Sequence, residues 1–254
     1  MKKIVSVVLT MMLLLGVQKM VTAETRVPPG TDVVAVYAQQ SKQPFARQGG
    51  VISFLDTVWI YLSDNSFVQY AFIDEKPFVF SKGVYHFENG SSFLAKKAGD
   101  NQSHLVIKRT AKFADKKGLK EYKSERRYEL NSLGFQNLFC LENKGKKIVA
   151  IFAGQNKQPY GDSRLIDTYW IFYDDMTFNQ YACSASDPIL FSEGTYSLSD
   201  GADFDYSENK KDYGKITITR SKKLKPGSNY ANHVSSHTYA LNTLGFELLV
   251  LDKD

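Results

Sequence analysis

Residues 56–90 read DTVWIYLSDNSFVQYAFIDEKPFVFSKGVYHFENG, and residues 167–201 read DTYWIFYDDMTFNQYACSASDPILFSEGTYSLSDG. The two stretches align without a gap at a spacing of 111 residues and are identical at 15 of 35 positions. Similarity of this length at one spacing indicates a tandem duplication. We therefore expect two related units, residues 32–143 and residues 147–254, joined by a short polar linker at 142–147.

Each copy alternates β-branched and aromatic residues with turn signals at short intervals, which is typical of successive strands rather than helices. In the first copy, for example, residues 64–66 read DNS and separate two strand-like segments, 57–62 and 67–73. Small β units avoid adhesive sheet edges by closing into barrels or packing as sandwiches. We predict an all-β protein of two tandem antiparallel up-and-down small barrels, with about seven or eight strands each and little helix.

The order of aromatic residues along each copy resembles that of bacterial lipocalin-like (calycin) domains. The resemblance lies in a Trp strand, turn and Phe strand (WIFYDDMTFNQY), a Gly-x-Tyr strand (GTYSL) and a closing hairpin (YALNTLGFELLVL), and it covers nearly all of each copy. The Gly-x-Trp opening of those domains is absent, since Asp-Thr-Val precedes Trp59 and Asp-Thr-Tyr precedes Trp170. The resemblance implies lipocalin-like barrels.

The alternation of side chains along a strand assigns residues to faces. One face carries Phe, Gln and Ala in both copies, so we expect it to point inward, and Arg109 and Arg220 continue an apolar face of a later strand. A polar group that points into an apolar interior needs a partner, which a ligand can supply. The candidate ligand-binding residues are therefore Trp59, Gln69, Tyr85, Arg109, Trp170, Gln180, Tyr196 and Arg220.

The same arginines have a second interpretation. In lipocalin-like barrels an Arg commonly lies over the Trp near the closed end, so the resemblance implies that Arg109 pairs with Trp59 and Arg220 with Trp170 as structural plugs. The sequence leaves both interpretations open, and with them the question of whether the barrels are open or filled.

The first 23 residues have the pattern of a secretory signal peptide. Lys2 and Lys3 precede an apolar run of about 14 residues, and the small-residue pattern Val-Thr-Ala ends at Ala23. The run is shorter than the roughly 20 residues that a membrane-spanning helix needs. We expect cleavage after Ala23 and a secreted, periplasmic or cell-envelope location, with no transmembrane segment in the mature chain.

The net charge of the mature chain limits its partners, and the two cysteines raise the question of a disulfide. Without the signal peptide, 29 basic residues face 27 acidic ones, so a nucleic-acid partner is not expected. The stretch 108–127 is rich in Lys and Arg and would suit either a solvated edge or an anionic envelope polymer. Cys140 and Cys183 are not equivalent in the two copies, and the sequence leaves open whether they form a disulfide.

No motif for a nucleophile, a phosphate loop, a dinucleotide or a metal is present, so no catalytic residue, cofactor or metal ligand is assigned. We predict an exported, non-catalytic binding protein for a small amphipathic ligand or a cell-envelope or host macromolecule. The alternatives are a secreted isomerase or hydrolase that uses Arg, Tyr and Asp of the barrels, and a structural envelope protein.

Overall fold

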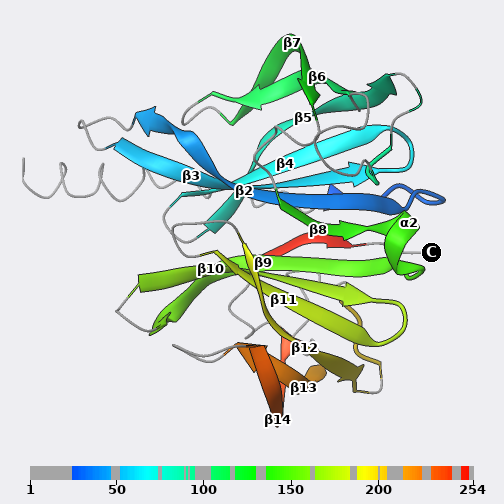
Figure 1. The fold of residues 1–254 in the computed structure, drawn as a ribbon, viewed down its shortest axis with the longest axis vertical. Coiled ribbons are helices and arrows are strands. Elements are labelled where there is room, and N and C mark those ends of the chain that lie inside the picture. The colour runs from blue at the N-terminus through cyan, green and yellow to red at the C-terminus, as the bar shows by residue number, and fades with distance from the viewer. Residues whose placement is uncertain are drawn as a thin grey trace, which may run out of the picture.

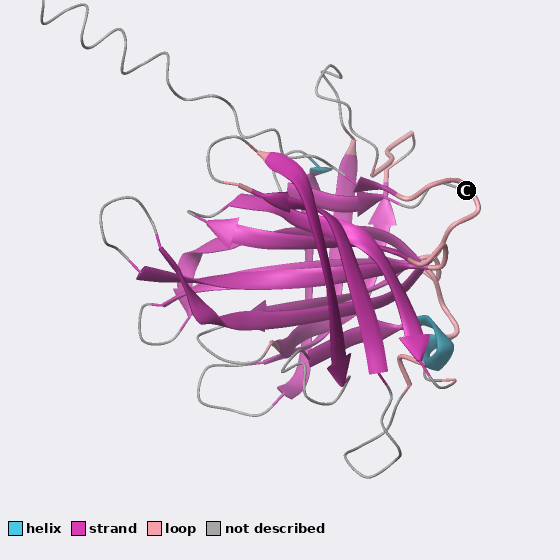
Figure 2. Cartoon of the chain, turned by 90° about the horizontal axis from the view of Figure 1, so that it is seen from above, coloured by secondary structure: helices cyan, strands magenta, loops and turns pink. Residues whose placement is uncertain are grey.

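The computed structural model describes residues 25–46, 52–73, 76–88, 90, 92–94, 104–114, 118–129, 136–160, 164–183, 188–199, 201–204, 214–224, 230–241 and 247–251. The signal peptide expected at residues 1–23 lies outside these ranges. Within them, no helix has both the length and the apolar character to cross a membrane. Nearly every described segment is a strand, and the short helix α2 (Leu141–Lys144) lies at one side (Figure 2).

The first copy forms a sheet of seven antiparallel strands in the order β7-β6-β5-β4-β3-β2-β8, the upper half of Figure 1. Apart from β8, neighbours in this order are also neighbours in sequence, as in a meander. The strands are β2 (Val33–Ala46), β3 (Ile52–Leu62), β4 (Ser66–Ile73), β5 (Lys76–Glu88), β6 (His104–Phe113), β7 (Leu119–Glu129) and β8 (Gln136–Cys140).

The second copy repeats this topology in the lower half of Figure 1, with the order β15-β9-β10-β11-β12-β13-β14. A short strand that precedes the first copy, β1 (Thr25–Arg26), joins the second sheet by pairing parallel to β15. The strands are β9 (Ile148–Tyr160), β10 (Arg164–Tyr173), β11 (Thr177–Cys183), β12 (Ile189–Leu198), β13 (Lys215–Leu224), β14 (Tyr230–Ala240) and β15 (Glu247–Leu251).

Each sheet curls over one face, which we call the inner face. In the first copy a single buried cluster joins Ala35 of β2 to Leu105 of β6, four strands away in the sheet order. Phe67 and Gln69 of the expected inward face are buried here. The second copy builds the matching cluster from the corresponding residues, including Phe152, Trp170, Phe172, Phe178 and Tyr196.

The opposite, outer faces of the two sheets pack against each other and form a third core. Val58 and Ile60 of the first copy share this cluster with Ile171 and Tyr173 of the second. The hydroxyl of Tyr70 donates to the Leu249 carbonyl at 2.7 Å, and that of Tyr181 donates to the Leu138 carbonyl at 2.8 Å. Strands β8 and β15, the latter red in Figure 1, lie between the two halves. Both faces of the central strands are therefore buried.

The all-β prediction is confirmed, but neither sheet is a closed barrel in the described residues. The first sheet ends at β7 on one side and at β8 on the other, and no described pairing joins them. Most side chains of β7 are exposed, among them Lys120, Glu121 and Lys123, and charged strands of this kind remain at a sheet edge. The expectation of lipocalin-like barrels is thus not confirmed. Two curved, open sheets stand in their place.

The linker expected at residues 142–147 is structured and contacts both copies. Its first part forms α2, and Lys147 pairs with Asp32 at 2.9 Å. Lys146 pairs with Asp175 at 3.4 Å. The segment between the copies therefore contributes contacts to both of them.

Candidate functional site

Three of the four candidate residues in each copy meet on the inner face, one from each of three strands. In the first copy Trp59 of β3 lies opposite Gln69 of β4, and Gln69 lies opposite Ser81 of β5. Arg109 of β6 lies opposite Gly83, two residues further along β5. Four adjacent strands thus contribute Trp, Gln, Ser and Arg in turn.

These side chains form a continuous polar chain under an aromatic ring. Arg109 Nε donates to Ser81 Oγ at 3.3 Å, and Ser81 Oγ donates to Gln69 Oε1 at 2.7 Å. The guanidinium carbon of Arg109 lies 5.3 Å from the centre of the Trp59 ring, a cation–π distance. Gln69 and Ser81 are buried, so their hydrogen bonds satisfy groups that would otherwise destabilise the fold.

The second copy has the same chain. Arg220 lies 5.3 Å from the Trp170 ring centre and donates to Ser192 at 3.4 Å, and Ser192 donates to Gln180 at 2.7 Å. This arrangement matches the interpretation of the arginines as structural residues. Each Arg stacks on a Trp, and the Ser and Gln side chains bond to each other and to the Arg. Sequence analysis missed Ser81 and Ser192, although the Phe-Ser pair is repeated in the two copies.

Tyr85 and Tyr196 lie in the same clusters but outside this polar chain. The Tyr85 hydroxyl donates to the Leu62 carbonyl and the Tyr196 hydroxyl to the Tyr173 carbonyl, both at 2.8 Å. Burial raises the pKa of Tyr85 well above its ordinary value and, with smaller effects of Asp175 and Asp174, raises that of Tyr196 to about 12. Both hydroxyls stay protonated at neutral pH.

Aromatic rings also pack against one another on the described part of each inner face. Tyr61 lies 5.0 Å from Tyr85 and 4.9 Å from Phe93, measured between ring centres. In the second copy Phe172 lies 5.0 Å from Phe204 and 5.1 Å from Tyr196. Such ring-to-ring contact is the packing of a core.

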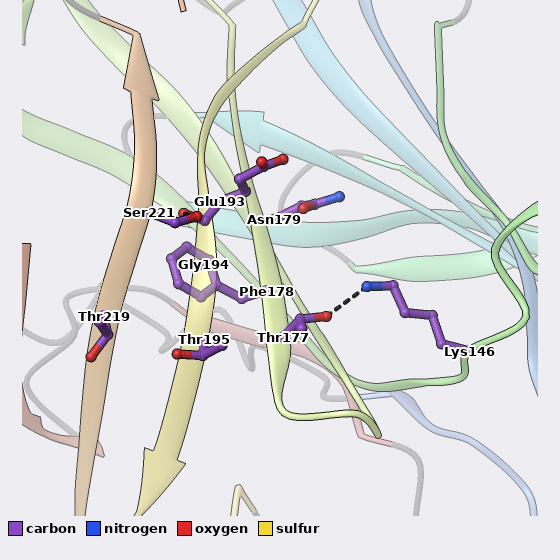
Figure 3. A pocket seen from close by; sticks show the side chains of 9 residues that line it. All are labelled: Lys146, Thr177, Phe178, Asn179, Glu193, Gly194, Thr195, Thr219 and Ser221. Atoms are coloured by element: carbon purple, nitrogen blue, oxygen red, sulfur yellow. Dashed lines mark hydrogen bonds between the residues drawn. The ribbon is translucent and has the colours of Figure 1, made fainter. Parts of the chain in front are cut away.

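Among the described residues, a pocket of about 320 Å³ lies on the outer face of the second copy (Figure 3). It lies beside the shared core, because its residue Asn179 bonds to the core residues Tyr173 and Tyr181. Lys146 enters from the segment after α2 and the other side chains come from the three strands (Figure 3). The lining residues are Lys146, Thr177, Phe178, Asn179, Glu193, Gly194, Thr195, Thr219 and Ser221.

The charged groups of the pocket have partners of opposite charge. Lys146 pairs with Asp175 at 3.4 Å. It also donates to the Thr177 hydroxyl at 2.6 Å (Figure 3). Glu193 pairs with Lys222 at 3.0 Å. Burial opposes the charge of Asp175, but hydrogen bonds from Thr177 and the nearby Lys146 outweigh it and lower the pKa of this carboxyl.

The floor of the pocket connects to the shared core. The Asn179 amide nitrogen donates to the hydroxyls of Tyr173 at 3.2 Å and Tyr181 at 3.4 Å. These bonds orient the amide group, so its oxygen points away from the two rings. Gly194 is needed where it stands, because a Cβ there would lie 2.0 Å from the Thr219 carbonyl oxygen.

Residues that the two copies share do not predict this pocket. The pocket lies where the copies differ: first-copy Val68, Lys82, Val84 and Lys108 occupy the positions of Asn179, Glu193, Thr195 and Thr219. A search for polar substitutions clustered on one face would have found the signal.

The remaining expectations concern the basic stretch and the cysteines. Within the stretch 108–127, Lys108 pairs with Glu125 and Lys123 with Glu121, as on a solvated edge. Cys140 is buried in the first inner cluster, whereas the side chain of Cys183 lies outside the described part of the structure.

Comparison with protein-family models, curated proteins and solved structures finds no match to this chain.

Proposed function

We propose that this chain is an exported, non-catalytic binding protein, built from two lipocalin-like units, that recognises its ligand or partner at the outer-face pocket of the second copy. The proposal is supported by the contrast between the inner faces and the outer-face pocket. In the described residues the inner faces contain packed aromatic rings and an Arg-Ser-Gln hydrogen-bond chain, whereas a pocket of about 320 Å³, lined by both polar groups and apolar surface, lies on the outer face of the second copy.

The chemistry of the inner faces supports binding over catalysis. A tyrosine acting as a general base needs a pKa near the working pH, and burial moves the pKa of Tyr196 to about 12. Arg220 stacks on Trp170 and donates to Ser192. Tyr196 and Arg220, two groups that a secreted isomerase or hydrolase could use, are thus engaged in packing.

Native mass spectrometry of the mature protein purified from its own host would test the proposal. We expect an adduct on the wild type, its loss from Thr219→Lys, and its retention by Trp59→Phe. Thr219 is half-buried at the pocket wall, and the substitution inserts the residue that the first copy has at this position, Lys108.

Trp59→Phe alters an inner face and leaves the pocket intact, which makes it the matched control. An adduct retained by Thr219→Lys but lost from Trp59→Phe would contradict the outer-face site. Absence of any adduct or partner on the wild type would contradict the binding function itself.

A further inference from the structure

Hydroxyl side chains make up four of the nine lining residues of the second-copy pocket, and further hydroxyls continue beyond it. Four of its lining residues are Thr177, Thr195, Thr219 and Ser221. A hydroxyl both donates and accepts hydrogen bonds and turns to suit its partner. A surface of such groups matches a ligand that also presents hydroxyls.

The hydroxyls form two ordered rows across three adjacent strands. One row is Thr195, Thr219 and Ser236, and the next is Ser197, Thr217 and Thr238, each set by the pairing register of β12, β13 and β14. Hydrogen bonds hold the rows in place: Thr217 and Thr238 lie 2.9 Å apart through their hydroxyl oxygens, and Thr219 and Ser236 lie 3.1 Å apart.

The row geometry suits a small ring with several hydroxyls. Neighbouring strands lie roughly 4.8 Å apart, so one sugar ring spans side chains of two strands. The oxygen of Asn179 and the carboxylate of Glu193 add two acceptors to the lining of the same pocket. Polar side chains of this kind fix the orientation of a ligand.

The charges of the pocket argue against an ionic ligand. Lys146 is paired with Asp175, and Glu193 is paired with Lys222. An anion would have to compete with Asp175 for Lys146, and a cation would compete with Lys222 for Glu193. The pocket therefore favours a polar ligand without net charge.

The first copy provides a natural comparison on the same fold. Its residues at the matching positions include Val84, which is 44% exposed, and Lys108, whose ammonium pairs with Glu125. Thr177 and Ser221 have hydroxyl counterparts in the first copy, Ser66 and Thr110, but none of the residues in the two rows does, so the β-meander does not require the rows.

We propose that the pocket of the second copy, with the hydroxyl rows beside it, binds a neutral carbohydrate. This inference rests on the proposed function and specifies the ligand class of the same site.

Saturation-transfer NMR on the mature protein would test it, with methyl glucoside, methyl galactoside, methyl mannoside and N-acetylglucosamine as probes and glucuronate and glucosamine as charged controls. We expect saturable transfer to at least one neutral sugar. Thr195→Val, which removes one hydroxyl with little change of shape, should weaken the binding about fivefold, the effect of one lost hydrogen bond.

The reverse substitution in the first copy, Val84→Thr, is the control and should leave the affinity unchanged. Transfer only to the charged probes, or equal weakening by Val84→Thr, would overturn the carbohydrate assignment. If no sugar binds while native mass spectrometry finds another adduct sensitive to Thr219→Lys, the carbohydrate class fails and the proposed function stands. If neither experiment detects a ligand, both fail.

Discussion

Ser81 and Ser192 each connect two larger polar groups on an inner face. Each hydroxyl accepts from an Arg Nε and donates to a Gln Oε1. Both serines are fully buried, with 0% of their surface exposed, so water cannot replace either bond. Loss of the hydroxyl would leave a buried carboxamide oxygen without its donor.

We predict that Ser81→Ala and Ser192→Ala each lower the free energy of unfolding by about 1–3 kcal/mol, the cost of a buried polar group without its partner. Because the Arg-Ser-Gln hydrogen bonds have matching geometry in the two copies, the two variants should lose similar amounts of unfolding free energy. Urea unfolding followed by tryptophan fluorescence would measure this loss.

Thr110→Ala, which removes an exposed hydroxyl of β6, is the control and should change stability by less than about 0.5 kcal/mol. If the serine variants are as stable as this control, the hydrogen bonds from Ser81 to Gln69 and from Ser192 to Gln180 do not contribute to stability.

At the scale of the element, the hairpin turns show how the copies diverged. The turn between β3 and β4 has Asn65 at φ 66°, and the matching turn between β10 and β11 has Met176 at φ 60°. Asn tolerates the left-handed region, whereas a long side chain such as Met is disfavoured there. The second turn therefore retains a strain that the first avoids.

We predict that Met176→Asn stabilises the protein by about 1 kcal/mol. The side chain of Met176 is 53% exposed, so its loss removes little packing. Thermal unfolding would show a higher midpoint for Met176→Asn and a lower one for the reverse change, Asn65→Met. A lower midpoint for Met176→Asn would show that Met176 makes a contact that outweighs the backbone strain.

A second element-scale feature is the irregular pairing of β12 with β13. The register shifts between Glu193 and Gly194, and Gly194 lies against the backbone of Thr219. Glycine in a strand often marks such a close approach of another backbone.

We predict that Gly194→Ala lowers the free energy of unfolding by about 3 kcal/mol or more, since the new Cβ would meet backbone that cannot rotate away. Ser197→Ala, at an exposed position of the same strand, is the control. Chemical denaturation compares the two. Equal stability of both variants would mean that the strands can separate at low cost.

At the scale of the whole molecule, the two copies meet as the halves of a symmetric dimer do. Tyr70 contacts Leu249 and Tyr181 contacts Leu138, and each pair is the other shifted by 111 residues. Reciprocal contact of this kind defines an isologous, two-fold interface. The shared core makes each copy depend on the other.

We therefore predict that the two copies unfold in one transition. The chain has two tryptophans, one in each inner cluster, so Trp170→Phe reports on the first copy and Trp59→Phe on the second. In each variant the urea transition followed by fluorescence should coincide with the one followed by far-ultraviolet circular dichroism. A separate fluorescence transition in either variant would indicate independent folding.

Buried tyrosines make stability sensitive to alkali. Burial raises the pKa of Tyr37 to about 12 and that of Tyr196 to about 12, from an ordinary 10.0. Between pH 10 and about 12, these tyrosines have lost their protons in the unfolded chain but retain them in the folded chain. The free energy of unfolding therefore falls as pH rises through this range. Below pH 10 the two groups stay protonated in both states and have no such effect.

We predict a progressive loss of stability from pH 10 to about 12, measured by urea unfolding at several pH values, with tyrosinate absorbance following the same course. Tyr196→Phe should show a shallower decline, because it lacks one of these groups. A decline that is unchanged in Tyr196→Phe would assign the effect to other residues.

The sequence alone determined the strands, the duplication and part of the inner site. Alternating aromatics and repeated turns predicted two antiparallel meanders. The lipocalin-like resemblance implied, as one of two interpretations, that Arg109 lies over Trp59 and Arg220 over Trp170, and the structure contains both stacks. These features depend on residues of the same strand or of adjacent strands. Side chains alternate between the two faces of a strand, so the sequence shows which of them share a face.

Only the tertiary structure decided how the outer faces are used. Residues such as Val68 and Asn179 differ between the copies, so their face looked less constrained than the inner one. In the folded chain part of that face packs the copies together, and part forms the pocket near Glu193 and Thr219. Packing between sheets and the placement of a pocket depend on residues far apart in sequence, and strand periodicity does not encode which sheet lies opposite.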